Sequence, residues 1–338
     1  MSRFATFLDT IGLTWLAPLA RACAGDQPGY QCRRTLSLAT PPLLALAFSL
    51  MAWQFIAMHV HVGTLQFPTP GQVWDRGIEQ VDEWRADRVA RSEHALAVTV
   101  MAAEQDMTEA QVLEYMPYQS KKLFINQIVL SLQTVFVGVG LALLVAIPVG
   151  LVCGSSAIAY SMLNPLIQLF KPVSPLAWFP IVYLIINRAI TSNDGPVSKS
   201  FLIAALVVAL CALWPALVNT AMGVANVEKD HLNVARVLNL SWHRRIWSII
   251  LPAATPAIFT GARISLGVGW MVLIAAEMMA VSPGIGGFIW DWYQSSNEIS
   301  LAYLMLSVLV IGFIGFLLDR MMITLQALAS RGRPGVIR

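Results

Sequence analysis

The chain has 338 residues, of which 57% are hydrophobic and only 12% are charged, and its mean hydropathy is +0.65. Soluble domains carry roughly a quarter of charged residues, so this composition excludes a soluble globular protein and predicts an all-α integral membrane protein. The net charge of +3 is too small to indicate a nucleic-acid partner.

No catalytic, metal or cofactor site is expected in this chain. The four cysteines (Cys23, Cys32, Cys153 and Cys211) show no paired spacing, which excludes a disulfide or zinc framework. The five histidines form no metal-ligand cluster, and no Ser/His/Asp set is brought together by the apolar segments. The phosphate-binding pattern G-x-x-x-x-G-K-[ST] is missing, so ATP-driven transport would require a separate ATPase.

Residues 1–40 are predicted to form a cytoplasmic arm with an amphipathic helix on the membrane surface. Its apolar positions recur near helical spacing at Phe4, Phe7, Leu8, Ile11, Trp15 and Leu19. A signal peptide ending at Ala22–Ala24 is the alternative, which Asp9 disfavours.

The first span is predicted at residues 41–60, which are uncharged and long enough to cross a bilayer. Residues 61–122 carry ten acidic and six basic residues and are predicted to form a periplasmic insertion with one or two helices. We interpret this insertion as packed on the outer membrane face; contact with a soluble binding protein is the alternative.

The predicted core occupies residues 123–322 and begins with a second span from Phe124 to Cys153. In this span Ser131 and the four glycines Gly138, Gly140, Gly150 and Gly154 provide small faces for helix packing.

The third span, from about Met162 to Asn187, contains three prolines and a lysine within 171–180. Each proline removes a backbone donor, so the helix is expected to bend or break, and irregular backbone at membrane depth is tolerated where it lines a cavity. We therefore predict a translocation pathway that includes Lys171, Pro172, Ser174, Pro175 and Trp178. The alternative is that Lys171 reaches a nearby interface or forms a structural pair.

The remaining predicted spans are Ser200–Val224, Ala253–Val281 and Ile299–Leu318, followed by a basic cytoplasmic tail at 323–338. Glu277 is the acidic residue deep within a span. We assign it to the pathway and hypothesise a buried pair with Lys171 or Arg263.

Six spans place both termini on the same side of the membrane. Lys and Arg number four before the first span, five from Lys229 to Arg263 and four from Arg320 onward, whereas residues 61–122 are net acidic. The positive-inside rule therefore predicts that both termini are cytoplasmic.

The loop at 225–252 has a distinctive spacing. Asn233-Val234-Ala235 is followed after three residues by Asn239, and after nine more by Ile249-Ile250-Leu251-Pro252. This spacing resembles the cytoplasmic coupling loop of ABC importer permeases, which reads Glu-Ala-Ala, three residues, Gly, nine residues, Ile-x-Leu-Pro. An ordinary positive-inside loop would explain the arginines but not the spacing.

Two residues of this loop carry structural expectations. After glycine, Asn best tolerates the positive φ at which a helix ends, so Asn239 is expected to end the first helix of the loop, and Ser241 is placed to cap the second. The resemblance implies that the loop docks on an ATPase subunit, through Asn233, Ala235, Arg236, Asn239, Ser241, His243 and Arg244.

Further motifs resemble the nitrate, sulfonate, taurine and bicarbonate branch of these permeases. They are Phe67–Trp74, Ser131–Gly150, Ala275–Met278, and most closely for nitrate permeases Lys171–Trp178 and Gly315–Arg320. The resemblance implies a type I importer fold with about six spans in the bacterial inner membrane. It also implies two ATPase subunits, a second permease copy and a periplasmic binding protein.

The expected substrate is a small inorganic anion, with nitrate first and nitrite, cyanate or bicarbonate as relatives. The electrostatics of one pathway lysine suit an aliphatic sulfonate or taurine equally well. A self-sufficient secondary anion transporter is the alternative from another class. It predicts internal repeats, and the three-proline span has no counterpart in the second half of the chain.

Overall fold

The computed structural model describes residues 17–23, 28–62, 65–118, 122–190, 198–228, 230, 233, 237–295 and 297–329. Within these ranges the regular structure is helical apart from one hairpin of two-residue strands, β1 (His61–Val62) and β2 (Leu65–Gln66). Five helices are long and apolar enough to cross a membrane, or six when one bent pair counts as a single span. The prediction of an all-α membrane protein with about six spans is confirmed.

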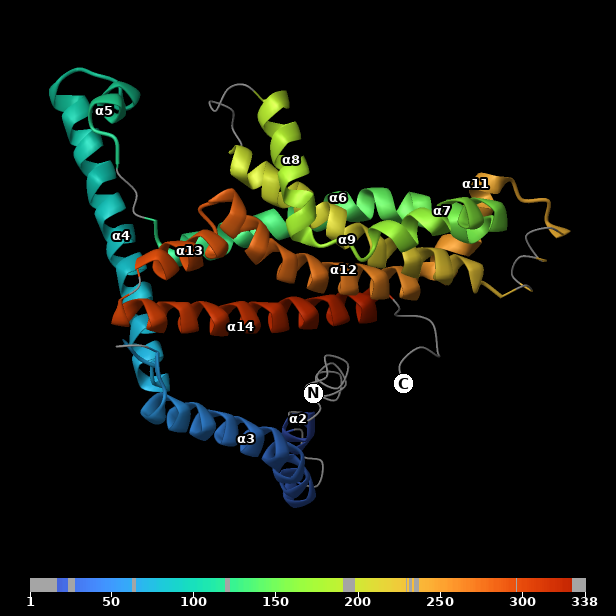
Figure 1. Ribbon diagram of the computed structural model, residues 1–338, viewed down its shortest axis with the longest axis horizontal. Helices are drawn as coiled ribbons and strands as arrows, with labels where there is room; N and C mark the ends of the chain where they lie inside the picture. Colours follow the sequence, from blue (N-terminus) through green and yellow to red (C-terminus); the bar gives the residue numbers. More distant parts are fainter. Residues whose placement is uncertain are drawn as a thin grey trace.

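Three helices form the centre of the bundle: α6 (Phe124–Ser155), α9 (Lys199–Ala225) and α12 (Leu251–Ala280). They run side by side in Figure 1. A Cβ at Gly138 would approach the carbonyl oxygen of Ala205 to 2.7 Å, and Gly150 and Gly154 lie equally close to α9, whereas Gly140 faces open space. Three of the four glycines therefore allow the close approach of α6 to α9 that membrane helices need.

Two more helices belong to the bundle: α13 (Ile285–Ser295) and α14 (Glu298–Ala329). α13 lies between the end of α12 and the start of α14 (Figure 1). Its Phe288 packs against Phe124 of α6 and Tyr303 of α14, with ring centroids 4.5 and 6.0 Å apart. α14 is also tied to α12 along its length, because Trp270 donates its indole N–H to the carbonyl of Ile311 at 3.1 Å.

The polar segment after the first span forms two helices, α4 (Pro70–Glu104) and α5 (Glu109–Tyr115). α4 starts at a capping box between Thr69 and Gln72 and crosses the bundle end against α14 and α6 (Figure 1). It is held there by buried Val73 and by a 3.1 Å hydrogen bond from Tyr303 to Glu79.

The chain after α5 is tied back to α4. Tyr118 donates its hydroxyl hydrogen to Asp87 at 2.8 Å, which raises the pKa of the Tyr118 phenol. Asp87 is buried and also pairs with Arg91 at 2.8 Å.

The first span belongs to α3 (Pro28–His59), which packs against α2 (Ala17–Cys23) and touches α4. α3 starts earlier than the expected residue 41 and continues through Pro41 and Pro42. The Thr40 hydroxyl donates to the Leu36 carbonyl at 2.8 Å and lies 3.4 Å from the Ser37 carbonyl, which Pro41 leaves without a backbone donor. The expected stripe at Phe4–Trp15 lies outside the described residues. Of the tail expected at 323–338, residues 323–329 continue α14 instead, and residues 330–338 lie outside the described residues.

Candidate functional site

The third span is broken where the prolines cluster. α7 (Ala157–Phe170) and α8 (Pro175–Ala189) meet at an angle of 99°, and α8 leaves the side of the bundle midway along its length (Figure 1). Pro175 stands at the first turn of α8, where a missing N–H costs nothing, and Ser174 caps that turn. The predicted break is confirmed, at 171–174.

The structure places the predicted pathway residues at this break. Lys171, Pro172 and Ser174 are exposed, and Pro175 and Trp178 are half-buried. Lys171 and Arg188 are the charged residues of α7, α8 and the turn between them. The break therefore combines an exposed ammonium group with helices that are otherwise uncharged except for Arg188.

Glu277 lies elsewhere and has different partners from those expected. Its carboxylate is fully buried near the end of α12. Ser131 of α6 donates its hydroxyl hydrogen toward both carboxylate oxygens, each at 2.8 Å, and the Gly286 backbone N–H donates to Oε2 at 2.9 Å. The Ile285 N–H donates to the Ser131 oxygen at 2.9 Å. This Glu277–Ser131 cluster holds the start of α13 against α6 and α12.

The hypothesis that Glu277 pairs with Lys171 or Arg263 is therefore wrong. Arg263 sits fourteen residues earlier on α12, about 21 Å along the helix axis. It binds Asp319 of α14 through two hydrogen bonds of 2.6 and 3.0 Å. Lys171 forms no ion pair with any described residue.

Sequence reasoning missed the partner Ser131 and the role of the glycines after α12. A Cβ at Gly284 would collide with the Glu277 carboxylate, and one at Gly286 would approach the Ile274 carbonyl to 2.5 Å. A buried carboxylate followed by Pro-Gly-Ile-Gly-Gly was the available signal, because closely spaced glycines mark a close backbone approach.

The predicted coupling loop has the expected left-handed residue. Asn239 has φ 48°, which confirms that Asn takes the conformation for which glycine is the usual choice. Half of the helix expected before it, from Val227 to Leu238, lies outside the described residues, and Ala235 and Arg236 are in that half. Ser241 directly precedes α11 (Trp242–Arg245), but its side chain makes no capping hydrogen bond, so that expectation is corrected.

The loop combines an anchored side with an exposed side. Ile246 and Ile250 of the following π-turn η1 (Ile246–Ile250) pack against Val224 and Val227 at the end of α9. The other side exposes basic and apolar groups: Val237, Leu238, Asn239, Trp242, His243, Arg244 and Trp247. Asn233 is exposed as well. This is a surface suited to a protein partner.

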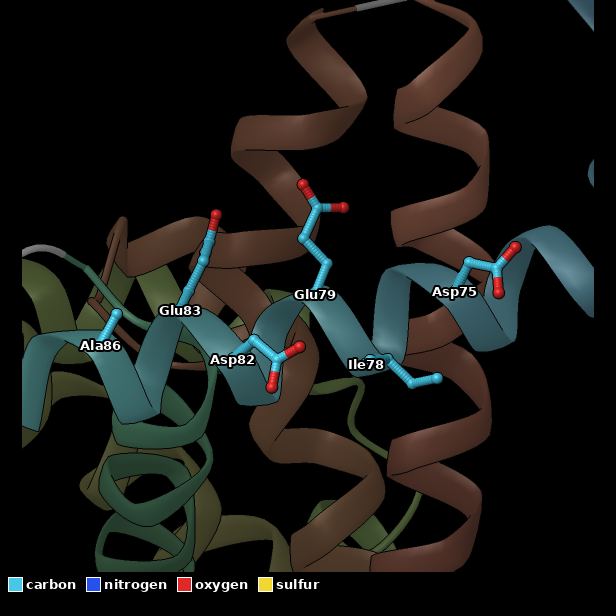
Figure 2. A pocket seen from close by; sticks show the side chains of 6 residues that line it. All are labelled: Asp75, Ile78, Glu79, Asp82, Glu83 and Ala86. Atoms are coloured by element: carbon cyan, nitrogen blue, oxygen red, sulfur yellow. The ribbon is translucent and has the colours of Figure 1, made fainter.

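A hollow of about 620 Å³ lies on α4, at the opposite end of the bundle from the loop. Its lining comes from one helix, with residues Asp75, Ile78, Glu79, Asp82, Glu83 and Ala86. Figure 2 shows the Glu79 and Glu83 side chains extending on the same side of α4. Four carboxylates would repel an anion, so the hollow is distinct from the break as a site.

A bundle of membrane spans with one span broken at mid-length and an exposed basic turn at one end fits the membrane subunit of a transporter. The sequence model of binding-protein-dependent transport system inner membrane components matches residues 146–327. The chain belongs to this family and is an ABC importer permease subunit. Membership implies an inner-membrane location and partners that hydrolyse ATP and bind substrate. The related subunits are not themselves catalytic.

Curated relatives and a solved structure agree with this assignment. The nitrate import permease NrtB of Synechococcus elongatus is 37% identical over 225 residues, which are 64% of this chain and 77% of that protein. The bicarbonate permease CmpB of Synechocystis is 32% identical over 87% of this chain and 89% of its own length. The taurine permease TauC of Escherichia coli is 35% identical over 60% of this chain and 68% of its own.

The solved structure supports the fold alone. A chain of the MetNI methionine ABC transporter in an inward-facing conformation superposes with a TM-score of 0.53 at 12% identity. The match covers 62% of this chain and 97% of that chain. The expected type I importer fold is confirmed.

Proposed function

We propose that this subunit carries a small inorganic oxyanion, nitrate first and then bicarbonate, nitrite or cyanate, across the inner membrane. The observation that carries the proposal is its similarity to permeases named for nitrate and bicarbonate at 32–37% identity over most of their length. An aliphatic sulfonate or taurine is the second candidate, favoured by the 35% identity to the taurine permease.

The proposed mechanism requires partners. ATP binds and is hydrolysed in separate ATPase subunits, which contact the exposed side of the loop at Asn233–Ser248. Two permease copies enclose the pathway, and a periplasmic binding protein delivers the anion. The termini are cytoplasmic, in agreement with the Lys and Arg counts. On that orientation α4 and α5 lie at the periplasmic end, opposite the loop.

Within this mechanism, the break between α7 and α8 forms part of the pathway. The exposed ammonium group of Lys171 attracts an anion, and apolar walls with few other charges allow it to leave again. Lys171→Gln is expected to lower anion uptake several-fold without changing ATPase assembly. Unchanged uptake would reduce Lys171 to a structural role.

The proposed function is tested with the reconstituted permease, ATPase and binding protein. Nitrate, bicarbonate, cyanate and taurine are added in turn, and the ATPase rate is measured. Stimulation by nitrate supports the proposal, whereas stimulation by taurine alone replaces the substrate. If no ATPase partner associates with the chain, the secondary-transporter alternative returns.

A further inference from the structure

Three helices meet at an aromatic cluster beside the break in the third span. Phe170, the last residue of α7, lies 5.8 Å from the ring of Trp178 on α8. It stacks at 6.0 Å, with an interplanar angle of 13°, on Trp214 of α9. Lys171 follows directly after Phe170. The cluster therefore joins both halves of the broken span to the central bundle.

The two indoles of this cluster each bury a hydrogen-bond donor without an acceptor. The Nε1 atoms of Trp178 and Trp214 are covered by the chain and have no hydrogen-bond partner. Buried Trp N–H groups usually find one, as Trp53 does with the Pro68 carbonyl at 3.0 Å and Trp270 with the Ile311 carbonyl at 3.1 Å. Two such exceptions on one cluster require an explanation.

The charges around the cluster fit an anionic acceptor. Lys171 directly follows Phe170, and α7, α8, α9 and the turn at 171–174 contain no Asp or Glu, whereas Arg188 and Lys199 lie at the distant ends of α8 and α9. The acidic residue of α12, which packs against α8 and α9, is Glu277, and its carboxylate is bound by Ser131 and Gly286. An indole N–H only donates, so the two unpaired Nε1 atoms can be satisfied by an acceptor and not by a cation. Apolar residues surround both rings, including Ile167 and Leu217 near Trp214, and a hydrogen bond is electrostatically stronger in such surroundings than in water.

We propose that the indole N–H groups of Trp178 and Trp214 donate hydrogen bonds to the oxyanion during its passage, forming a binding site at the helix break. The inference rests on the proposed function and deepens it by naming the donors. Neutral donors hold an anion weakly enough to release it. Lys171 supplies the long-range attraction. In the conformation described here both N–H groups are covered, so movement of α8 relative to α7 has to open the site.

The test uses Trp178→Phe and Trp214→Phe in the reconstituted complex of permease, ATPase and nitrate-loaded binding protein. Each variant retains an aromatic face and removes the N–H group. Nitrate uptake per ATP hydrolysed is expected to fall about tenfold for each lost bond to the anion. Co-purification of the ATPase subunits with each variant is the check on assembly. Trp290→Phe, whose ring stacks on Tyr293 of α13 instead, is the matched control and should transport normally.

Thermal unfolding of the purified complex distinguishes a binding role from a structural one. All three Trp→Phe changes lose ring volume and so lower Tm, but Trp270→Phe also loses a bond to Ile311 and should therefore lower Tm by more than Trp178→Phe or Trp214→Phe. A fall in Tm for both pathway variants equal to that of Trp270→Phe would overturn the inference. Should one Phe variant fail to assemble, the other carries the test. Trp178→His and Trp214→His, which keep a ring N–H, should each transport more nitrate than the Phe variant at the same position.

The inference and the proposed function fail in different ways. Wild-type complex that assembles with its ATPase but transports no inorganic oxyanion would refute the proposed function, and with it the substrate of the site. If the wild-type complex takes up nitrate and both Phe variants take it up at the same rate, the inference alone is refuted.

Discussion

Replacing Glu277 with Ala should release the start of α13 from the bundle. The carboxylate accepts hydrogen bonds from the Ser131 hydroxyl and the Gly286 N–H in a fully buried position. Truncation leaves both donors unpaired, and an unpaired buried donor costs about 1–3 kcal/mol. We therefore expect a loss of about 2–6 kcal/mol from the two donors together, before any contribution from the cavity.

A graded series separates the hydrogen bonds from the side-chain volume. Glu277→Gln retains an acceptor for Gly286 but cannot accept from Ser131 through both terminal atoms, so we expect a loss of about 1 kcal/mol. Ser131→Ala removes the acceptor of the Ile285 N–H and should fall between the two. Glu93→Ala, an exposed change on α4, is the control and should have no effect.

The assay combines thermal unfolding of the purified complex with hydrogen exchange of the α13 amides. We expect Tm to fall more for Glu277→Ala than for Glu277→Gln. Hydrogen exchange should accelerate first at Ile285 and Gly286, because their N–H groups are held by this cluster. If Glu277→Ala kept the wild-type Tm and the α13 amides stayed protected, the cluster would not be what holds α13, and the reasoning would be refuted.

Three further predictions address packing, backbone conformation and an ion pair. Gly284→Ala should cost about 1–3 kcal/mol because its Cβ collides with the buried carboxylate, while Gly140→Ala, which faces open space, should leave Tm unchanged; equal effects would contradict the packing described. Asn239→Gly should retain ATPase co-purification, whereas Asn239→Val should weaken it, since a positive φ costs an L-residue about 1–2 kcal/mol; the prediction is wrong if Val is tolerated. A double-mutant cycle of Arg263→Met and Asp319→Asn should show a coupling energy of about 0.5–1 kcal/mol. The value is small because the two side chains are 40% and 36% exposed, and solvent weakens their attraction. A coupling energy near zero would show that the pair does not join α12 to α14.

Much of the fold could be read along the chain because its causes are local. Uncharged runs of 20 residues or more locate four of the six predicted spans, since length and hydropathy decide whether a helix can cross a bilayer. Proline chemistry located the break at 171–174, and the scarcity of residues that tolerate a positive φ identified Asn239 as a helix end. The loop spacing was recognisable for the same reason, because helix, turn and helix are consecutive.

The partners of the charged and polar side chains could not be read in this way. Arg263 and Asp319 are 56 positions apart, and Ser131 and Glu277 are 146 apart. A sequence pattern gives the face of a helix on which a residue lies, but not the rotation and height at which two helices pack. The expected Lys171–Glu277 pair assumed a common depth that the helices do not give them. By itself the sequence determined the spans, the break and the loop. Only the tertiary structure decided that Glu277 holds α13, that Asp319 neutralises Arg263, and that two indole donors remain unpaired beside the break. Each of these depends on which distant groups the packed helices bring within hydrogen-bonding distance.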